Sequence, residues 1–322
     1  MFQPLIGQKA AVELLQQAVN KDRLAPAYLF VGPNGIGKSL AAECFIELIF
    51  NQYKKSQKNI DPALIKSKIK QRNHADLFWV EPTYLHQNKL LSAKEAEEAG
   101  VKRKTPPQIR LEQIREISNF LSRPPLEIER SIVVIEQADS MAESPANGLL
   151  KTLEEPGRAT LILLAPSIDS LLPTLVSRCQ RIPFYRLAEA DMRQVLTATD
   201  QTEILHHKEV LAMAQGSPGD AIACWQQLQN ISPDLLKSVT HDIKNTKTAL
   251  TIAKEINQNL DNEAQLWLID YLQHHYWLKQ QKKGHNYQLV LKELEKSRKY
   301  LLRFVQPRLV WECALMTIAQ SS

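Results

Sequence analysis

Eight residues near the N-terminus have the types and spacing of a phosphate-binding loop. They are Gly32, Pro33, Asn34, Gly35, Ile36, Gly37, Lys38 and Ser39. In the pattern G-x-x-x-x-G-K-S, glycines let backbone N–H groups turn toward phosphate oxygens, and the helix that follows adds a partial positive charge. Lys38 then reaches the β- and γ-phosphates, and the Ser39 hydroxyl can ligate Mg²⁺. This P-loop predicts a site for ATP or ADP with Mg²⁺.

Hydrolysis of a bound nucleotide needs a second group of residues at the end of another strand. There an acidic residue holds Mg²⁺ and a neighbouring carboxylate activates water. The best match is the segment 133–139, V-V-I-E-Q-A-D. It contains Glu136, Gln137 and Asp139, and for Asp139 a turn or cap role is favoured over catalysis.

These residues need a strand before the P-loop, a helix after it and a second strand ending beside it. Short apolar runs, typical of buried strands, occupy residues 28–31 and 77–80, and near-continuous aliphatic runs, typical of parallel strands covered on both faces, occupy residues 131–135 and 161–165. Helical spacing marks residues 11–19, 40–50 and 109–121, and another helix starts at Pro145 with Ser144 as its cap. The polar stretches 51–75 and 86–108 resemble solvated insertions. We therefore expect an α/β domain with a parallel sheet over residues 1–185.

Strand signals end near residue 185, and the rest of the chain has helical patterns. Residues 187–228 suggest short helices broken at Gly216–Gly219, and residues 233–320 suggest longer ones, the last beginning at Pro307. We expect a small helical domain over 186–230 and a C-terminal helical domain over 231–322.

Composition and charge narrow the function classes. A net charge of +5 with 23% charged and 44% hydrophobic residues is that of an ordinary globular chain, and it is weak evidence for nucleic acid. Four scattered cysteines form no C-x-x-C pair, so a reducing, cytoplasmic setting is expected. No apolar run approaches about 18 residues, so no membrane span is expected. The basic residues within 51–75 and 101–104 could touch DNA, but a solvated face is the favoured interpretation.

The stretch from residue 132 to 156 resembles a known family. Its second half reads A-N-G-L-L-K-T-L-E-E-P, which is similar to the Walker B region of bacterial clamp-loader AAA+ proteins, usually D-E-A-D followed by A-N-A-L-L-K-T-L-E-E-P. The resemblance implies an AAA+ P-loop α/β domain with a parallel sheet, then a small helical lid domain and a C-terminal all-α collar domain for oligomerisation. Many relatives also carry a four-cysteine zinc module, but residues 51–75 contain no cysteine, so no zinc is expected.

Two departures from this family pattern bear on hydrolysis. Glu136 stands where the magnesium-associated aspartate is expected, and Gln137 stands where the catalytic glutamate should be. A glutamine cannot accept a proton from water, and loss of a general base commonly costs about 10²-fold or more. We therefore expect ATP hydrolysis by this chain alone to be weak or absent.

Arg178 lies in the string S-R-C, which resembles the motif whose arginine reaches into the nucleotide site of a neighbouring subunit. A guanidinium suits that task because it stays charged and binds phosphate oxygens in pairs. Taken alone, Arg178 would be read as a surface salt-bridge residue. The motif context favours an arginine finger that acts in trans.

Gly219 narrows the resemblance further. It stands in G-S-P-G where active loader ATPases have a sensor arginine, a form familiar in the delta prime group of DNA polymerase III clamp loaders. The resemblance implies a cytoplasmic ring with gamma/tau and delta subunits that loads a sliding clamp onto primed DNA. Two alternatives remain: an active freestanding or gamma/tau-type ATPase, and a scaffold whose P-loop stays empty.

Overall fold

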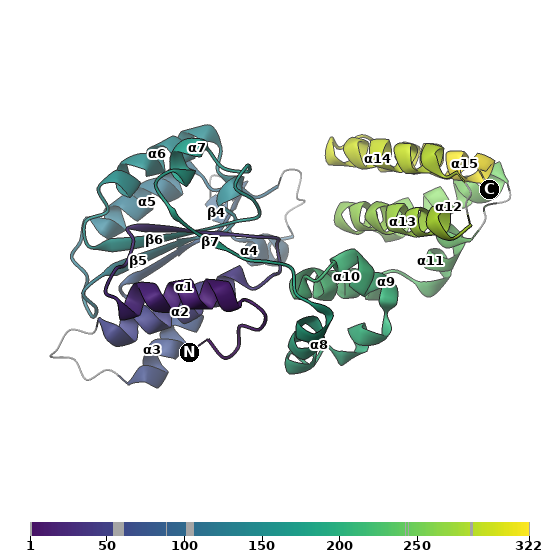
Figure 1. The fold of residues 1–322 in the computed structure, drawn as a ribbon. Helices are drawn as coiled ribbons and strands as arrows, with labels where there is room; N and C mark the ends of the chain where they lie inside the picture. Colours follow the sequence, from purple (N-terminus) through teal and green to yellow (C-terminus); the bar gives the residue numbers. More distant parts are fainter. Residues whose placement is uncertain are drawn as a thin grey trace. The chain divides into compact units, whose positions relative to one another are not determined.

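The computed structural model describes residues 2–53, 61–87, 89–100, 106–241, 243, 245–283 and 286–321 (Figure 1). Contacts within the chain group it into two compact units. Unit 1 is Met1–Thr202 with Gly216–Gly219, and unit 2 is Glu203–Gln215 with Asp220–Ser322. The finer division into three domains, with boundaries near residues 185 and 230, stays a prediction.

The described part of unit 1 is built on a sheet of five parallel strands in the order β2-β5-β6-β1-β7. The strands are β1 (Ala27–Val31), β2 (Leu77–Val80), β5 (Ser131–Ile135), β6 (Ala159–Ala165) and β7 (Gln180–Pro183). The expected parallel α/β architecture is therefore confirmed. The strand β7 was not expected, because its polar Gln180 and Arg181 are exposed at the sheet edge and break the aliphatic pattern.

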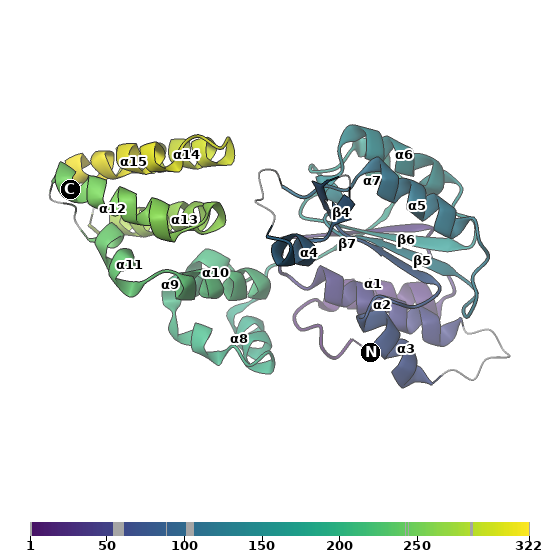
Figure 2. The ribbon, with the colours of Figure 1, turned by 180° about the vertical axis from the view of Figure 1, so that it is seen from behind.

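Helices cover both faces of this sheet. On one face lie α1 (Lys9–Asn20), α2 (Lys38–Gln52) and α3 (Pro62–Lys70), and on the other lie α5 (Leu111–Leu121), α6 (Glu143–Glu154) and α7 (Pro173–Val176), as Figures 1 and 2 show. Ile117, Leu149 and Leu163 are fully buried among the side chains between the second group and the sheet. Because α6 begins at Glu143 with Ala142 before it and has no side-chain cap, the expected cap at Ser144 is wrong.

The two polar stretches contain more structure than expected. Helix α3 is capped by the Asp61 side chain and buries Ile65 and Ile69, so this part of 51–75 is not simply solvated. In the second stretch, β3 (Tyr84–His86) pairs antiparallel with β4 (Lys89–Leu91), followed by α4 (Ala93–Glu98). Residues 54–60 and 101–105, which carry much of the basic charge considered for DNA contact, lie outside the described residues.

A buried carboxylate fixes the loop before β5. Asp76 is 1% exposed, and its carboxylate accepts backbone N–H bonds from Leu126, Glu127 and Ile128 at 2.5, 2.7 and 2.8 Å. Its backbone carbonyl also accepts from Ile132 N at 2.8 Å. These bonds fix the point at which β5 enters the sheet. They therefore also fix the positions of Glu136 and Gln137, which follow β5.

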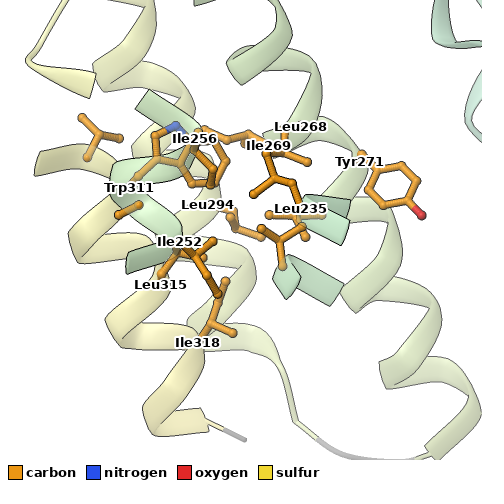
Figure 3. Close-up of a cluster of buried hydrophobic side chains, with 14 of the residues drawn as sticks. Leu235, Ile252, Ile256, Leu268, Ile269, Tyr271, Leu294, Trp311, Leu315 and Ile318 are labelled. Atoms are coloured by element: carbon orange, nitrogen blue, oxygen red, sulfur yellow. The ribbon is translucent and has the colours of Figure 1, made fainter. Parts of the chain in front are cut away.

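Helix α8 (Glu189–Ala198) follows the sheet in unit 1, and the described part of unit 2 is helical. Its main helices are α9 (Lys208–Ala214), α10 (Pro218–Asn230), α11 (Pro233–Thr240), α12 (Thr246–Asn259), α13 (Asn262–Lys283), α14 (Gln288–Leu302) and α15 (Pro307–Ser321), of which α10 begins with two residues of unit 1. Figure 3 shows its core around Trp311, whose indole N–H donates to buried Gln265 at 2.9 Å. The expected C-terminal helical region is confirmed, including its last helix from Pro307.

Candidate nucleotide site and arginine contact

The P-loop joins the carboxyl end of β1 to the first turn of α2. Gly37 has φ 101°, a conformation that side chains rarely adopt, and helix α2 starts at the next residue. A cavity of about 390 Å³ opens at this point. It is lined by Asn34, Gly35, Gly37, Lys38, Ser39, Leu40, Glu136, Gln137 and Leu164. The structure thus brings most of the predicted P-loop residues and both residues after β5 to one cavity.

The Lys38 side chain is bound to the loop that carries it. Only 8% of the residue is exposed, and its ammonium donates to the carbonyl oxygens of Gly32 and Pro33, the latter at 2.7 Å. An ammonium has three N–H donors, and two of them meet these carbonyls. The charge of Lys38 is therefore held inside the loop, at the edge of the cavity.

The segment Gly216–Gly219 contacts the P-loop directly. Ser217 is fully buried and its hydroxyl donates to Asn34 O at 2.8 Å, while Gly219 N donates to Gly35 O at 2.9 Å. A Cβ atom added at Gly219 would lie 2.5 Å from the Cα of Gly35. The position predicted to have lost a sensor arginine is thus also one where two backbones meet too closely for any side chain.

Glu136 and Gln137 follow β5 at the same edge of the sheet as the P-loop. Glu136 N donates to Val80 O at 2.9 Å, which fixes the turn, and Gln137 is exposed with φ 45°. Asp139 lies exposed in a short 3₁₀ turn, Ala138–Ser140, as its turn interpretation anticipates. The two positions after β5 therefore offer the cavity one carboxylate and one neutral amide.

Arg72, which belongs to the polar stretch 51–75 that was expected to be solvated, is a neighbour of this site. It follows α3, and its guanidinium Nη2 lies 3.2 Å from Glu136 Oε1. The charges of Arg72 and Glu136 also act on Glu43 of α2. Burial raises the pKa of the Glu43 carboxyl, and the negative charge of Glu136 adds to this rise, whereas the positive charges of Arg72 and Lys70 oppose it. No local pattern predicts the Arg72 contact, because it joins residues 64 positions apart.

Arg178 lies after α7, outside the residues that line the P-loop cavity. Its Nε and Nη2 both donate to Glu154 Oε1, at 3.1 and 2.6 Å, and Nη1 donates to Thr174 O at 3.0 Å. The guanidinium stays about one third exposed. Beside it, burial raises the pKa of the Cys179 thiol to about 11. The side chain is thus on the surface, turned to α6 of its own chain, and no sequence pattern predicted Glu154 as its partner.

The described ranges contain neither a cluster of metal ligands nor a helix that could span a membrane. No three His, Cys, Asp or Glu side chains there lie together as a metal site needs. None of the described helices combines the length and apolar character that crossing a bilayer requires.

The sequence is similar to those of known proteins. The sequence model described as "DNA polymerase III, delta subunit" matches residues 7–188, and that of the "Cyanobacterial DNA polymerase III delta prime, C-terminal domain" matches residues 190–318. DNA polymerase III subunit delta' of Bacillus subtilis is 30% identical over 216 residues, which are 67% of this chain and 58% of the relative. The corresponding Pseudomonas aeruginosa subunit is 30% identical over 64% of this chain and 57% of its own length.

These matches span less than two thirds of the length of the curated relatives. Among solved structures, a DNA polymerase III gamma subunit-related protein from Thermotoga maritima aligns with a TM-score of 0.56 at 15% identity. That alignment covers 97% of this chain and 99% of the other. At such low identity it supports the fold alone.

Proposed function

The chain belongs to the DNA polymerase III delta prime family, and we propose that it acts as a delta-prime-like subunit of a clamp loader. In this proposal an ATP-driven ring loads a sliding clamp onto primed DNA. This chain contributes little ATP hydrolysis of its own and supplies Arg178 to the nucleotide site of a neighbouring subunit. Its proposed partners are the gamma/tau and delta subunits, in the bacterial cytoplasm, as part of the DNA polymerase III holoenzyme.

One observation carries this proposal: the residues that cradle phosphate are present, but the groups that would promote hydrolysis are not beside them. Gln137 offers the cavity an amide that cannot take a proton from water. Gly219 has no side chain, and its backbone sits against Gly35. Arg178 faces the surface, from where it could reach a second chain. These features fit a subunit that binds nucleotide without hydrolysing it and that assists hydrolysis at the site of a neighbouring subunit.

The nucleotide part of the proposal rests on the P-loop. Backbone N–H groups at the start of α2, with Lys38 and the Ser39 hydroxyl, would receive the phosphates of ATP or ADP. The sequence assigns Mg²⁺ to Ser39 and Glu136. The residues fit that ion poorly, because one oxygen of the Glu136 carboxylate is engaged by Arg72 and Gln137 is neutral. The proposed ligand of this P-loop is therefore ATP or ADP, with no Mg²⁺ held by Glu136.

The runner-up is an active ATPase of the gamma/tau type. It is favoured by the intact P-loop and by the tau subunit of Bacillus subtilis, which is 25% identical over 73% of this chain. The two proposals differ in the activity of the isolated chain. An active ATPase would turn over ATP by itself, and Gln137→Glu would change the rate little.

Two measurements test the leading proposal. The first is equilibrium binding of labelled ATP to the wild type and to Lys38→Ala, in which the wild type binds and the variant does not. The second is co-purification with the gamma/tau and delta subunits of the same organism, in which we expect a stable complex. A chain that hydrolyses ATP at full rate alone and does not join these subunits would contradict the proposal.

A further inference from the structure

The guanidinium of Arg72 is held in place by three neighbours. Nη2 lies 3.2 Å from Glu136 Oε1, and Nη1 lies 3.0 Å from Glu81 Oε2. The guanidinium carbon stands 4.5 Å from the centroid of the Trp79 ring, within the range of a cation–π contact. These contacts come from β2, the turn after β2 and the end of β5. Arg72 therefore has a defined position beside the Walker B carboxylate, although the side chain is about one third exposed.

The backbone of Arg72 supports this placement. Its φ of 56° lies in the left-handed region that non-glycine residues adopt infrequently, and the residue directly follows the last turn of α3. The chain turns sharply here, and Asn73 N bonds back to Lys68 O at 3.0 Å. Arg72 N also donates to Ile69 O at 2.9 Å, and these two bonds form a Schellman motif, so the end of α3 fixes this backbone conformation and the point from which the Arg72 side chain leaves the chain.

Positive charge already stands beside Glu136 without a metal ion. Arg72 is paired with Glu136 and Glu81, its charge also acts on the Glu43 carboxyl, and Lys38 lines the same cavity as Glu136. A Mg²⁺ ion takes oxygen ligands in near-ideal octahedral geometry and gives up its water molecules reluctantly. At Glu136 such an ion would meet a carboxylate whose Oε1 is bound to a guanidinium, and it would be repelled by that positive charge.

We propose that Arg72 takes the place of Mg²⁺ as the cation at Glu136, so that the P-loop of this chain binds nucleotide without needing Mg²⁺. The inference rests on the proposed nucleotide binding and specifies how it occurs. Phosphate charge is met by Lys38, by Ser39 and by the N–H groups at the start of α2. The carboxylate that would otherwise hold the ion is neutralised from within the chain, by the segment that follows α3.

The experiment measures the affinity of the full chain for a fluorescent ADP analogue, with Mg²⁺ and with EDTA. For the wild type we expect the two dissociation constants to agree within about threefold, because Mg²⁺ is not held at Glu136 and acts only as a screening ion. For Arg72→Gln, which frees Glu136, we expect binding to become roughly tenfold tighter with Mg²⁺ than with EDTA. The double variant Arg72→Gln with Glu136→Gln should lose this acquired response, which would assign it to the freed carboxylate.

Three controls accompany the test. Glu81→Gln removes the other ion pair of Arg72 and should leave binding independent of Mg²⁺, and so should Arg72→Lys, which keeps the positive charge. Circular dichroism verifies that each variant is folded. A wild type that needs Mg²⁺, or an Arg72→Gln variant that responds to Mg²⁺ as the wild type does, would overturn the inference while leaving nucleotide binding intact. Absence of binding in both conditions would instead overturn the nucleotide site itself, and the inference with it.

Discussion

Replacement of Gly219 by alanine tests whether the P-loop is supported from the segment Gly216–Gly219. Gly219 N donates to Gly35 O at 2.9 Å, and an added Cβ would lie 2.5 Å from the Cα and 3.0 Å from the carbonyl oxygen of Gly35. Both atoms belong to backbone, so no side-chain rotation can relieve the overlap. The two segments would have to separate by about 1 Å to reach an ordinary contact distance of 3.4 Å or more.

The cost follows from three terms. Overpacking of this kind typically costs about 1–3 kcal/mol, and a weakened backbone hydrogen bond adds about 0.5–1.5 kcal/mol. Alanine near the start of a helix recovers at most about 1 kcal/mol relative to glycine. The φ of Gly219 is outside the positive range, so alanine meets no backbone penalty of its own. With middle values for the three terms, we expect a net loss of about 2 kcal/mol in the free energy of unfolding.

Urea unfolding and nucleotide binding together measure this effect. Gly148→Ala is the matched control: Gly148 also lies in a helix, but its added Cβ would meet the end of the Leu111 side chain at 3.3 Å, which can move. We expect Gly148→Ala to be neutral or slightly stabilising, and Gly219→Ala to lose both stability and affinity for ADP. A Gly219→Ala chain that matches the wild type in both measurements would refute the packing argument. Gly219→Arg carries the same Cβ, so we expect it to weaken the loop rather than restore hydrolysis.

Three other substitutions test how the site is supported. Asp76→Asn weakens the hydrogen bonds from the N–H groups of Leu126, Glu127 and Ile128, so we expect the free energy of unfolding in urea to fall by about 2–3 kcal/mol. A variant as stable as the wild type would contradict this role of Asp76. Glu154→Gln breaks the exposed pair with Arg178, so the unfolding free energy should change by less than about 1 kcal/mol; a larger loss would mean that the pair is structural. Burial lowers the pKa of His74 below its usual 6.5, so the unfolded chain takes up the proton first as the pH falls. Stability should therefore be full above about pH 6.5 and decline below it, and His74→Asn should reduce that slope; an unchanged slope would exclude His74 as its source.

The sequence predicted four strands of the sheet but missed the edge strand β7 and the helix α3. Strands β2 and β5 begin and end where expected, because each is a short apolar run bounded by polar residues. The edge strand β7 was missed because one side of it faces solvent and carries Gln180 and Arg181. Helix α3 was missed for a similar reason, since only Ile65 and Ile69 are buried in a segment rich in lysine.

The site was predictable in part. The P-loop and the residues after β5 were found because each is a local pattern tied to a strand end, and parallel strands place their carboxyl ends at one edge. The pairs Arg72–Glu136 and Arg178–Glu154 could not be found in this way, because they depend on the packing of segments far apart in the sequence. Likewise, the absence of a side chain at Gly219 looked like a lost arginine, whereas the structure adds a steric reason for glycine.

The central claim is that this chain assists hydrolysis on a neighbour rather than performing it. DNA-stimulated ATP turnover of a clamp loader reconstituted with the gamma/tau and delta subunits tests this directly, with either Lys38→Ala or Arg178→Ala in this chain. We expect turnover to persist with Lys38→Ala and to fall with Arg178→Ala by about 10³-fold at the one site that Arg178 serves. Loss of turnover with Lys38→Ala, or unchanged turnover and clamp loading with Arg178→Ala, would contradict the account.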